Sequence, residues 1–150
     1  MPTHYQGNPK EVQALDTFIK FTRAANAFEA RLFARQAIED LTPSQFGILE
    51  TLYHLGPLCQ GEVSSKLLKS TGNVTLVLDN LEKRGLVRRE RDTGDRRMVR
   101  IYLTPAGEEV IKRIFPQMVA AVESELSILT QEEQAQLGNL CRILGKNSRQ

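Results

Sequence analysis

The segment LEKRGLVRRERDTGDRRMVRIYLTPAG, residues 81–107, decides the fold. In its second half Val99, Ile101 and Leu103 alternate with other side chains, which is the period of two that marks a β-strand. Residues 86–91 supply an opposing strand, and Asp92-Thr93-Gly94-Asp95 supplies the turn between the two. We therefore predict a two-stranded antiparallel hairpin with a polar tip.

The positive charge of the chain is concentrated on this hairpin. Residues 83–100 hold eight basic and three acidic side chains, a net charge of +5, whereas the whole chain has a formal net charge of +2. Seven of the eight basic residues are arginine, which is suited to planar, bidentate contacts with phosphates and guanine edges. The hairpin is therefore either a nucleic-acid-binding element or a solvated basic loop.

Three short helices are predicted before the hairpin. Thr42, Pro43 and Gln45 form a capping box with proline at the first helical position, and a helix from Thr42 to Leu55 follows, with Phe46, Leu49, Leu52 and Tyr53 inward. The second helix covers residues 60–67. The third begins at Ser70 or Thr71 and ends near Gly85, with an inward face of Val74, Val77, Leu78 and Leu81.

Long helices are predicted at both ends of the chain. Apolar residues, including Phe18 and Phe21, recur at helical spacing over residues 10–38. Either a second chain or the C-terminal helices of the same chain cover this face, and the length of the helix favours a second chain. Thr104-Pro105 caps a fifth helix. Thr130 and Glu133 open a sixth helix that ends at Gly145 and carries Leu137, Leu140, Cys141 and Leu144 inside.

Composition excludes several classes of protein. With 150 residues, 41% hydrophobic and 25% charged, the chain has the balance of one globular domain. No apolar stretch approaches the roughly 20 residues that span a bilayer, and two cysteines cannot form a disulfide framework. We expect a cytoplasmic protein with reduced thiols and no membrane association.

The order of helices and hairpin points to nucleic acid. Two short helices joined by a turn and followed by a basic hairpin are the arrangement of a winged helix-turn-helix, whose second helix enters the major groove. The predicted fold is mainly α, with a two-stranded wing and long dimerisation helices at both termini. We assign residues 1–40 to the N-terminal dimerisation helix, 41–104 to the DNA-binding lobe and 105–150 to the C-terminal dimerisation helices.

Five ordered motifs resemble the MarR family of bacterial transcription regulators: Leu41-Thr-Pro-Ser-Gln-Phe46, Gly72-Asn-Val-Thr75, Leu81-Glu-Lys-Arg-Gly-Leu-Val87, Asp95-Arg-Arg97 and Leu103-Thr-Pro-Ala-Gly107. The resemblance implies a homodimer that binds a pseudo-palindromic double-stranded DNA operator, more often as a repressor than as an activator. It also implies release by a small-molecule inducer, with phenols as a ligand class found in the family, or by an oxidant.

Site residues follow from the resemblance and from physical chemistry. Small polar side chains at the start of the third short helix let it lie close in the groove. At the wing, the carboxylate of Asp95 is expected to hold Arg97 extended into the minor groove, where narrow A·T-rich segments deepen the negative potential. Leu76 could touch a thymine methyl or pack inward, and it is not assigned. The assigned residues are Ser70, Thr71, Gly72, Asn73, Thr75 and Asn80 for the major groove; Asp95, Arg96 and Arg97 for the wing; and Lys66, Lys69, Arg84, Arg88 and Arg91 for phosphates.

Other chemistry finds little support in the sequence. The N-terminal helix lacks the cysteine with which some relatives sense peroxide. Cys59 precedes a predicted helix N-terminus, a position that can favour thiol reactivity, so a redox role for Cys59 is a minor hypothesis. Two histidines and two cysteines make no convincing metal set, and we predict no cofactor and no catalysis. Tyr53, Phe18, Phe21 and His54 form either a ligand pocket or core, and no ligand residue is assigned.

Two other functions are open on sequence grounds. A winged-helix interaction module could use its arginine hairpin to bind an acidic protein partner, and it would show no preference for DNA sequence. A small-molecule carrier or enzyme would require a pocket with catalytic groups, for which no motif is present. Sequence preference on DNA separates the first of these from a transcription regulator.

Overall fold

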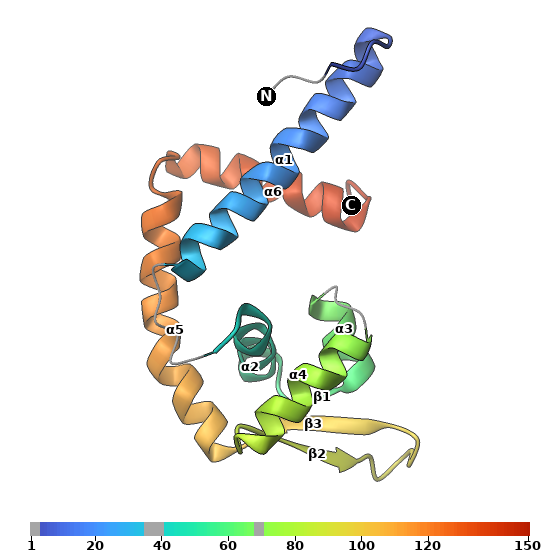
Figure 1. Cartoon of the computed structure of the whole chain (residues 1–150), viewed down its shortest axis with the longest axis vertical. Helices are drawn as coiled ribbons and strands as arrows, with labels where there is room; N and C mark the ends of the chain where they lie inside the picture. The colour runs from blue at the N-terminus through green and yellow to red at the C-terminus, as the bar shows by residue number, and fades with distance from the viewer. Residues whose placement is uncertain (1–3, 35–40, 68–70) are drawn as a thin grey trace. The chain divides into compact units, whose positions relative to one another are not determined.

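The computed structural model describes residues 4–34, 41–67 and 71–150. These residues are mostly helical with a small sheet, as predicted (Figure 1). They divide into two compact units, which we call the helical unit (residues 1–35 and 120–150) and the winged unit (residues 36–119). The elements are α1 (Pro9–Ala34), α2 (Pro43–Leu55), β1 (Leu58–Cys59), α3 (Gln60–Leu67), α4 (Thr71–Lys83), β2 (Val87–Arg91), β3 (Val99–Leu103), α5 (Pro105–Leu126) and α6 (Gln131–Lys146).

The sheet of the winged unit contains the predicted hairpin and one further strand. β2 and β3 pair antiparallel, with Arg89 opposite Ile101, and β1 pairs with the other edge of β3 through Leu58 opposite Ile101. The sequence pattern predicted two strands and missed β1. Two residues are too few to show a period of two, so this strand has no signal in the sequence.

The core of the winged unit is built by the helix-turn-helix, β3 and α5. The side chains of Ile48, Leu49, Leu78, Leu81, Ile101 and Ile111 are completely buried. The inward face predicted for α4 is confirmed for Val74, Leu78 and Leu81, whereas Val77 is half-buried. Tyr53 was predicted inward but is 37% exposed, because it lies at the edge of the buried stripe of α2, whose centre includes Ile48 instead.

Local backbone chemistry sets the helix ends. Both predicted capping boxes are present: Thr42 and Thr130 each accept a hydrogen bond from a backbone N–H three residues later. Gly85 has φ 71°, a left-handed conformation that turns the chain from α4 toward β2. The prediction that Gly145 ends α6 is wrong. The helix runs to Lys146, because Asn147 adopts the left-handed conformation and its N–H bonds to the carbonyls of the last turn.

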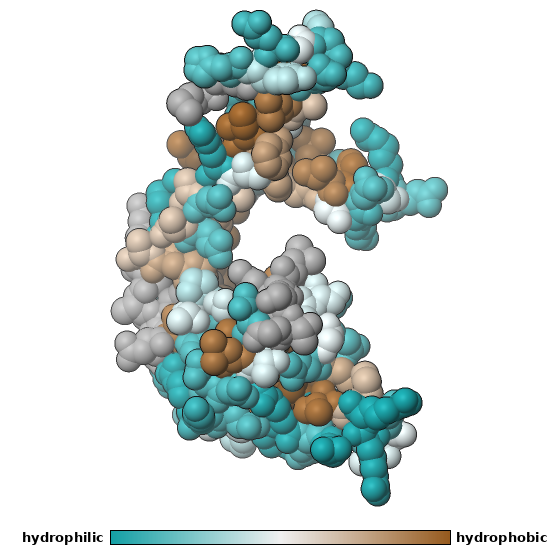
Figure 2. All heavy atoms as spheres, turned by 45° about the vertical axis from the view of Figure 1, so that its right-hand side comes forward, coloured by the Kyte–Doolittle hydropathy of each residue, from teal (hydrophilic) through white to brown (hydrophobic). Residues whose placement is uncertain are grey.

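The helical unit leaves apolar faces uncovered within one chain. α6 has no buried residue: Leu137, Leu140 and Leu144 are 44%, 61% and 62% exposed, and Cys141 is also exposed, so the prediction that they lie inside is wrong for the single chain. On α1, Phe18 and Phe21 are 60% and 43% exposed. Figure 2 shows hydrophobic side chains gathered at the surface of this unit.

α1 begins where the sequence predicted and is described as far as Ala34. The last predicted residues of this helix, 35–38, lie outside the described residues. Over the ranges that the structure describes, no helix combines the length and the apolar character needed to cross a membrane.

Candidate nucleic-acid interface

A short polar network fixes α3 against α4. The N–H of Cys59, the residue before α3, donates to Glu62 Oε2 at 2.7 Å, which is the contact that the third helical residue makes in a capping box. From the same turn, Gln60 Nε2 donates to Thr75 Oγ1 on α4 at 2.6 Å. The packing of Val63 and Val74, both buried, completes the helix pair. The hydrogen bond from Gln60 to Thr75 therefore holds α4 against α3.

The face of α4 directed away from the core is mainly polar. Asn73, Asn80 and Lys83 are exposed on it, and Leu76 is 63% exposed among them. The opposite side of the helix carries Val74 and Leu78, which are buried. Of the residues predicted for the major groove, Asn73 and Asn80 therefore share this face. Thr71 and Gly72 form the first turn of α4, and Ser70 lies outside the described residues, as does Lys69.

Thr75 is exposed beside this face but has an intramolecular role as well. Its hydroxyl oxygen accepts the hydrogen bond from Gln60, and its backbone carbonyl accepts one from Arg89 Nη2 at 3.1 Å. Thr75 thus helps to position α4 in addition to any contact with a base or phosphate.

Arg89 connects the wing to α4, and the sequence analysis did not single it out. Its Nη1 lies 2.6 Å from Asp79 Oδ1, and its backbone N–H donates to Glu82 Oε2 at 3.1 Å. Among the described residues, nothing accepts a hydrogen bond from its buried Nε. The signal was present in the strand period: Arg89 is opposite buried Ile101, so the two side chains share the inner face of the hairpin.

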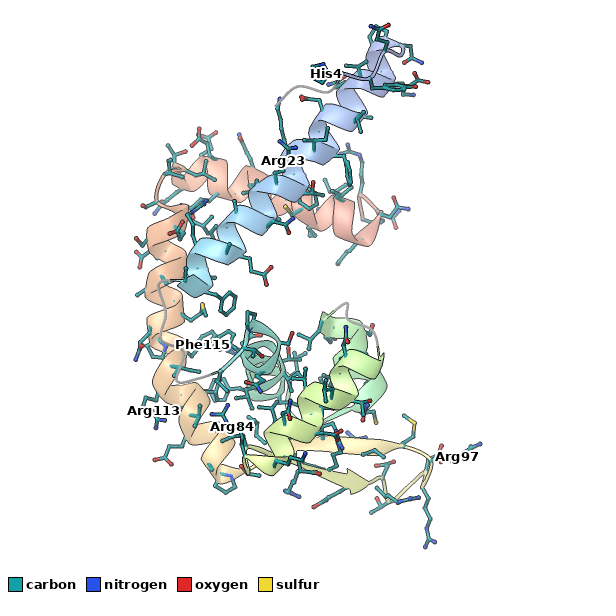
Figure 3. All side chains as sticks on the ribbon, viewed as in Figure 1. His4, Arg23, Arg84, Arg97, Arg113 and Phe115 are labelled. Atoms are coloured by element: carbon teal, nitrogen blue, oxygen red, sulfur yellow. The ribbon has the colours of Figure 1, made fainter. Side chains whose placement is uncertain are left out.

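The tip of the wing holds Asp95 and Arg97 together. Asp95 Oδ1 accepts hydrogen bonds from the backbone N–H of Arg97 at 3.0 Å and from its Nε at 3.3 Å. The Asp95 N–H in turn donates to Asp92 Oδ2 at 3.3 Å, which tightens the turn. The Arg97 side chain is 91% exposed and extends from the end of the hairpin (Figure 3). A guanidinium held at such a tip is available to an anionic partner.

The remaining basic residues differ in how far they are engaged within the chain. Arg88 lies over the Tyr102 ring at 4.3 Å and pairs with Glu90, while Arg91 donates to the Arg96 carbonyl at 3.4 Å. Both are exposed, and so are Lys66, Arg84 and Arg96. Hydrophilic side chains cover the surface around the hairpin (Figure 2). These cations surround α4 and the wing with positive charge.

The winged unit also contains a cluster of three aromatic side chains, Tyr53, His54 and Phe115. The His54 ring makes edge-on contacts with Tyr53 at 5.1 Å and with Phe115 at 4.8 Å between centroids. His54 Nε2 lies 3.8 Å from Glu50 Oε1. Nearby, Glu108 raises the pKa of Lys112 above its ordinary value, because it accepts a hydrogen bond from the ammonium group and adds a negative charge. Phe18 and Phe21 belong to the helical unit.

The thiols and histidines form no metal centre in the part of the chain that the structure describes. Cys59 carries a free thiol that is only 6% exposed. It does precede α3, as predicted, but an oxidant would have to reach a buried sulfur. Burial therefore weighs against the redox hypothesis for Cys59.

Comparisons with known sequences agree with this geometry. The model of the MarR family matches residues 41–99, which include α2, the helix pair, β2 and the first residue of β3. A relative from Bacillus subtilis, the uncharacterized HTH-type transcriptional regulator YkoM, is 34% identical over 94% of this chain and 92% of its own length. The similarity therefore extends beyond the winged unit into the flanking helices.

Solved structures show the same fold. Sco3205, a MarR family transcriptional regulator from Streptomyces coelicolor solved in complex with DNA, has a TM-score of 0.80 and 27% identity, covering 96% of this chain and 91% of its own. The PcaV transcriptional regulator from the same organism, solved with its natural ligand, has a TM-score of 0.75 and 25% identity, covering 84% of this chain and 89% of its own.

Proposed function

This chain belongs to the MarR family of transcription regulators, and from this premise we propose that it is a homodimeric repressor. Its operator is a pseudo-palindrome, because a twofold dimer presents the same contacts to two half-sites. A small ligand releases it. Catalysis is not part of this function, since the family consists of regulators.

The proposal rests mainly on the presence of two exposed polar elements in the winged unit. One is the outward face of α4, with Asn73 and Asn80, and the other is the wing tip, with Arg97 held by Asp95. In a winged helix-turn-helix these elements enter the major and the minor groove. Sco3205 shares the fold and was solved in complex with DNA, which supports DNA as the partner.

The residues in contact with phosphates are proposed from exposure and charge. Lys66, Arg84, Arg88, Arg91 and Arg96 are exposed cations of the winged unit, and each can neutralise a phosphate on binding. From the sequence we add Lys69 to the phosphate contacts, and Ser70, Thr71 and Gly72 to the major-groove contacts; Lys69 and Ser70 lie outside the described residues. Such contacts give affinity that falls steeply with salt, whereas Asn73, Asn80 and Arg97 supply sequence preference.

For the dimer, we propose that a second copy covers the exposed leucines of α6 and the phenylalanines of α1. Leu137, Leu140 and Leu144 recur at helical spacing, and their exposure in one chain leaves a large apolar face in water. A twofold arrangement buries this face against its own copy and sets the two α4 helices about one turn of DNA apart.

For the ligand, we propose the cluster of Tyr53, His54 and Phe115 as part of the contact surface. Three aromatic rings and the nearby cation Lys112 suit a flat, anionic or phenolic compound. The complex of PcaV with its natural ligand supports a small-molecule effector for this fold.

Selection of random duplex DNA by the purified protein, followed by sequencing of the bound pool, tests the proposal. Enrichment of an inverted repeat is expected, and Arg97→Ala protein should enrich it less strongly. A folded dimer that enriches no sequence, both as purified and after refolding from denaturant to strip any bound ligand, would contradict the proposal and favour an interaction module with an acidic protein partner.

A further inference from the structure

Leu76 stands out on the surface of α4. It is 63% exposed, and no other large apolar side chain is exposed among the described residues of this helix. Two residues along an α-helix turn about 200°, so Leu76 lies on the side opposite buried Val74 and Leu78. Asn73 and Asn80 are exposed on the same face, three residues before and four after. The sequence left open whether Leu76 packs inward, and the structure shows that it does not.

The neighbouring contacts keep Leu76 exposed. Thr75 receives hydrogen bonds from Gln60 of α3 and from Arg89 of β2, and Asp79 pairs with the same arginine. These contacts prevent α4 from rolling about its axis to bury the leucine. A leucine side chain exposed to water at the centre of a polar face stabilises a complex when a partner covers it, because its apolar surface is then removed from water.

We propose that Leu76 recognises thymine through its C5-methyl group in the major groove. This inference rests on the proposed function, and it assigns one specificity contact within it. Thymine presents an apolar methyl group at the floor of the major groove, and apolar side chains can recognise it by contact. The Asn73 and Asn80 amides on either side suit the hydrogen-bonding edges of adjacent bases. Each half-site of the operator therefore contains a thymine opposite Leu76.

The test uses the duplex enriched by selection and replaces its thymines with deoxyuridine one at a time. Deoxyuridine keeps the hydrogen-bonding edge of thymine and lacks only the methyl group. We expect one position in each half-site at which the replacement weakens binding of the unmodified protein roughly fourfold, the effect of one buried methyl group. At other positions the two duplexes should bind alike or differ to a smaller extent.

Leu76→Ala protein then identifies the side chain responsible. It should bind the thymine and the deoxyuridine duplexes equally at that position, because the apolar contact is already absent. Leu55→Ala is the matched control: Leu55 is 55% exposed on α2, and its removal should leave the discrimination unchanged. Both variants should be folded, because each replaced side chain is more than half exposed. Circular dichroism checks this.

Three results would overturn the inference, and they are distinguishable. Equal binding of all thymine and deoxyuridine duplexes by the unmodified protein would show that no methyl group is recognised, although DNA binding itself would stand. Discrimination that persists unchanged in Leu76→Ala would assign the contact to another residue. Failure of the folded protein to enrich any duplex would remove the proposed function and this contact with it.

Discussion

Arg89 Nη1 of the wing lies 2.6 Å from Asp79 Oδ1 of α4, and this ion pair joins the two elements proposed to bind DNA. The Arg89 side chain is only 22% exposed, and it also donates to the Thr75 carbonyl. An ion pair in this partly buried position, with a second hydrogen bond, is better defined than an exposed surface pair. The ion pair therefore fixes the position of the wing relative to α4.

Disrupting this pair should weaken DNA binding and stability together. Arg89→Met keeps the apolar stem and removes the guanidinium, and Asp79→Asn removes the charge of the partner. We expect each variant to lower the free energy of unfolding by about 1 kcal/mol and the pair to show a coupling of about 0.5–1 kcal/mol in a double-mutant cycle. Urea unfolding and DNA titration measure the two effects. Additive losses in the double variant would refute a direct interaction.

Arg97 should matter for binding without mattering for folding. Its side chain is 91% exposed, so Arg97→Ala should leave the unfolding midpoint unchanged. Loss of a guanidinium from the groove should cost roughly 1–3 kcal/mol in operator binding. Titration over a range of salt concentrations measures both the affinity and its salt slope.

The control for Arg97 is Arg23→Ala, which removes an equal charge from an exposed site on α1. Its operator affinity should stay close to that of the unmodified protein. Asp95→Ala should give part of the Arg97→Ala loss, because it frees the arginine from its partner without removing the charge. If both arginine variants bound equally well, the wing tip would have no specific role.

Gly107 should tolerate no side chain. A Cβ added there would overlap the Leu86 carbonyl oxygen, where α5 meets the start of the wing. We expect Gly107→Ala to lower the free energy of unfolding by about 1–3 kcal/mol. Gly61→Ala is the matched control in the same unit, because nothing lies within 4 Å of the added methyl. A loss as large in the control would show that the Leu86 contact is not the cause.

Much of this fold is predictable because its signals are local. The capping boxes at Thr42 and Thr130 and the period of two around Ile101 each depend on residues within a few positions of one another. The same holds for the wing tip, where Asp95 and Arg97 are two residues apart. Local hydrogen bonds of this kind leave a clear pattern in the sequence.

Features that depend on distant residues were missed. The strand period places Arg89 on the inner face of the hairpin, but it does not identify the partner, because Asp79 lies ten residues away on a different element. β1 exists only because β3 offers it an edge. The exposure of Leu140 on α6 could not be predicted either, because an apolar stripe looks the same whether its own chain or a second copy covers it.

The exposed stripe of α6 leads to a prediction about assembly. Leu140→Glu combined with Leu144→Glu places charges on a face that we expect to be buried between two copies. Burial of a leucine contributes about 1.5–3 kcal/mol, so loss from both positions should weaken association at least a hundredfold. Sedimentation should show monomers, and operator affinity should fall because the two half-sites are no longer bound together. Met98→Glu alters an exposed apolar residue at the wing, 43% exposed, and should remain dimeric. A double variant that stays dimeric would place the interface elsewhere.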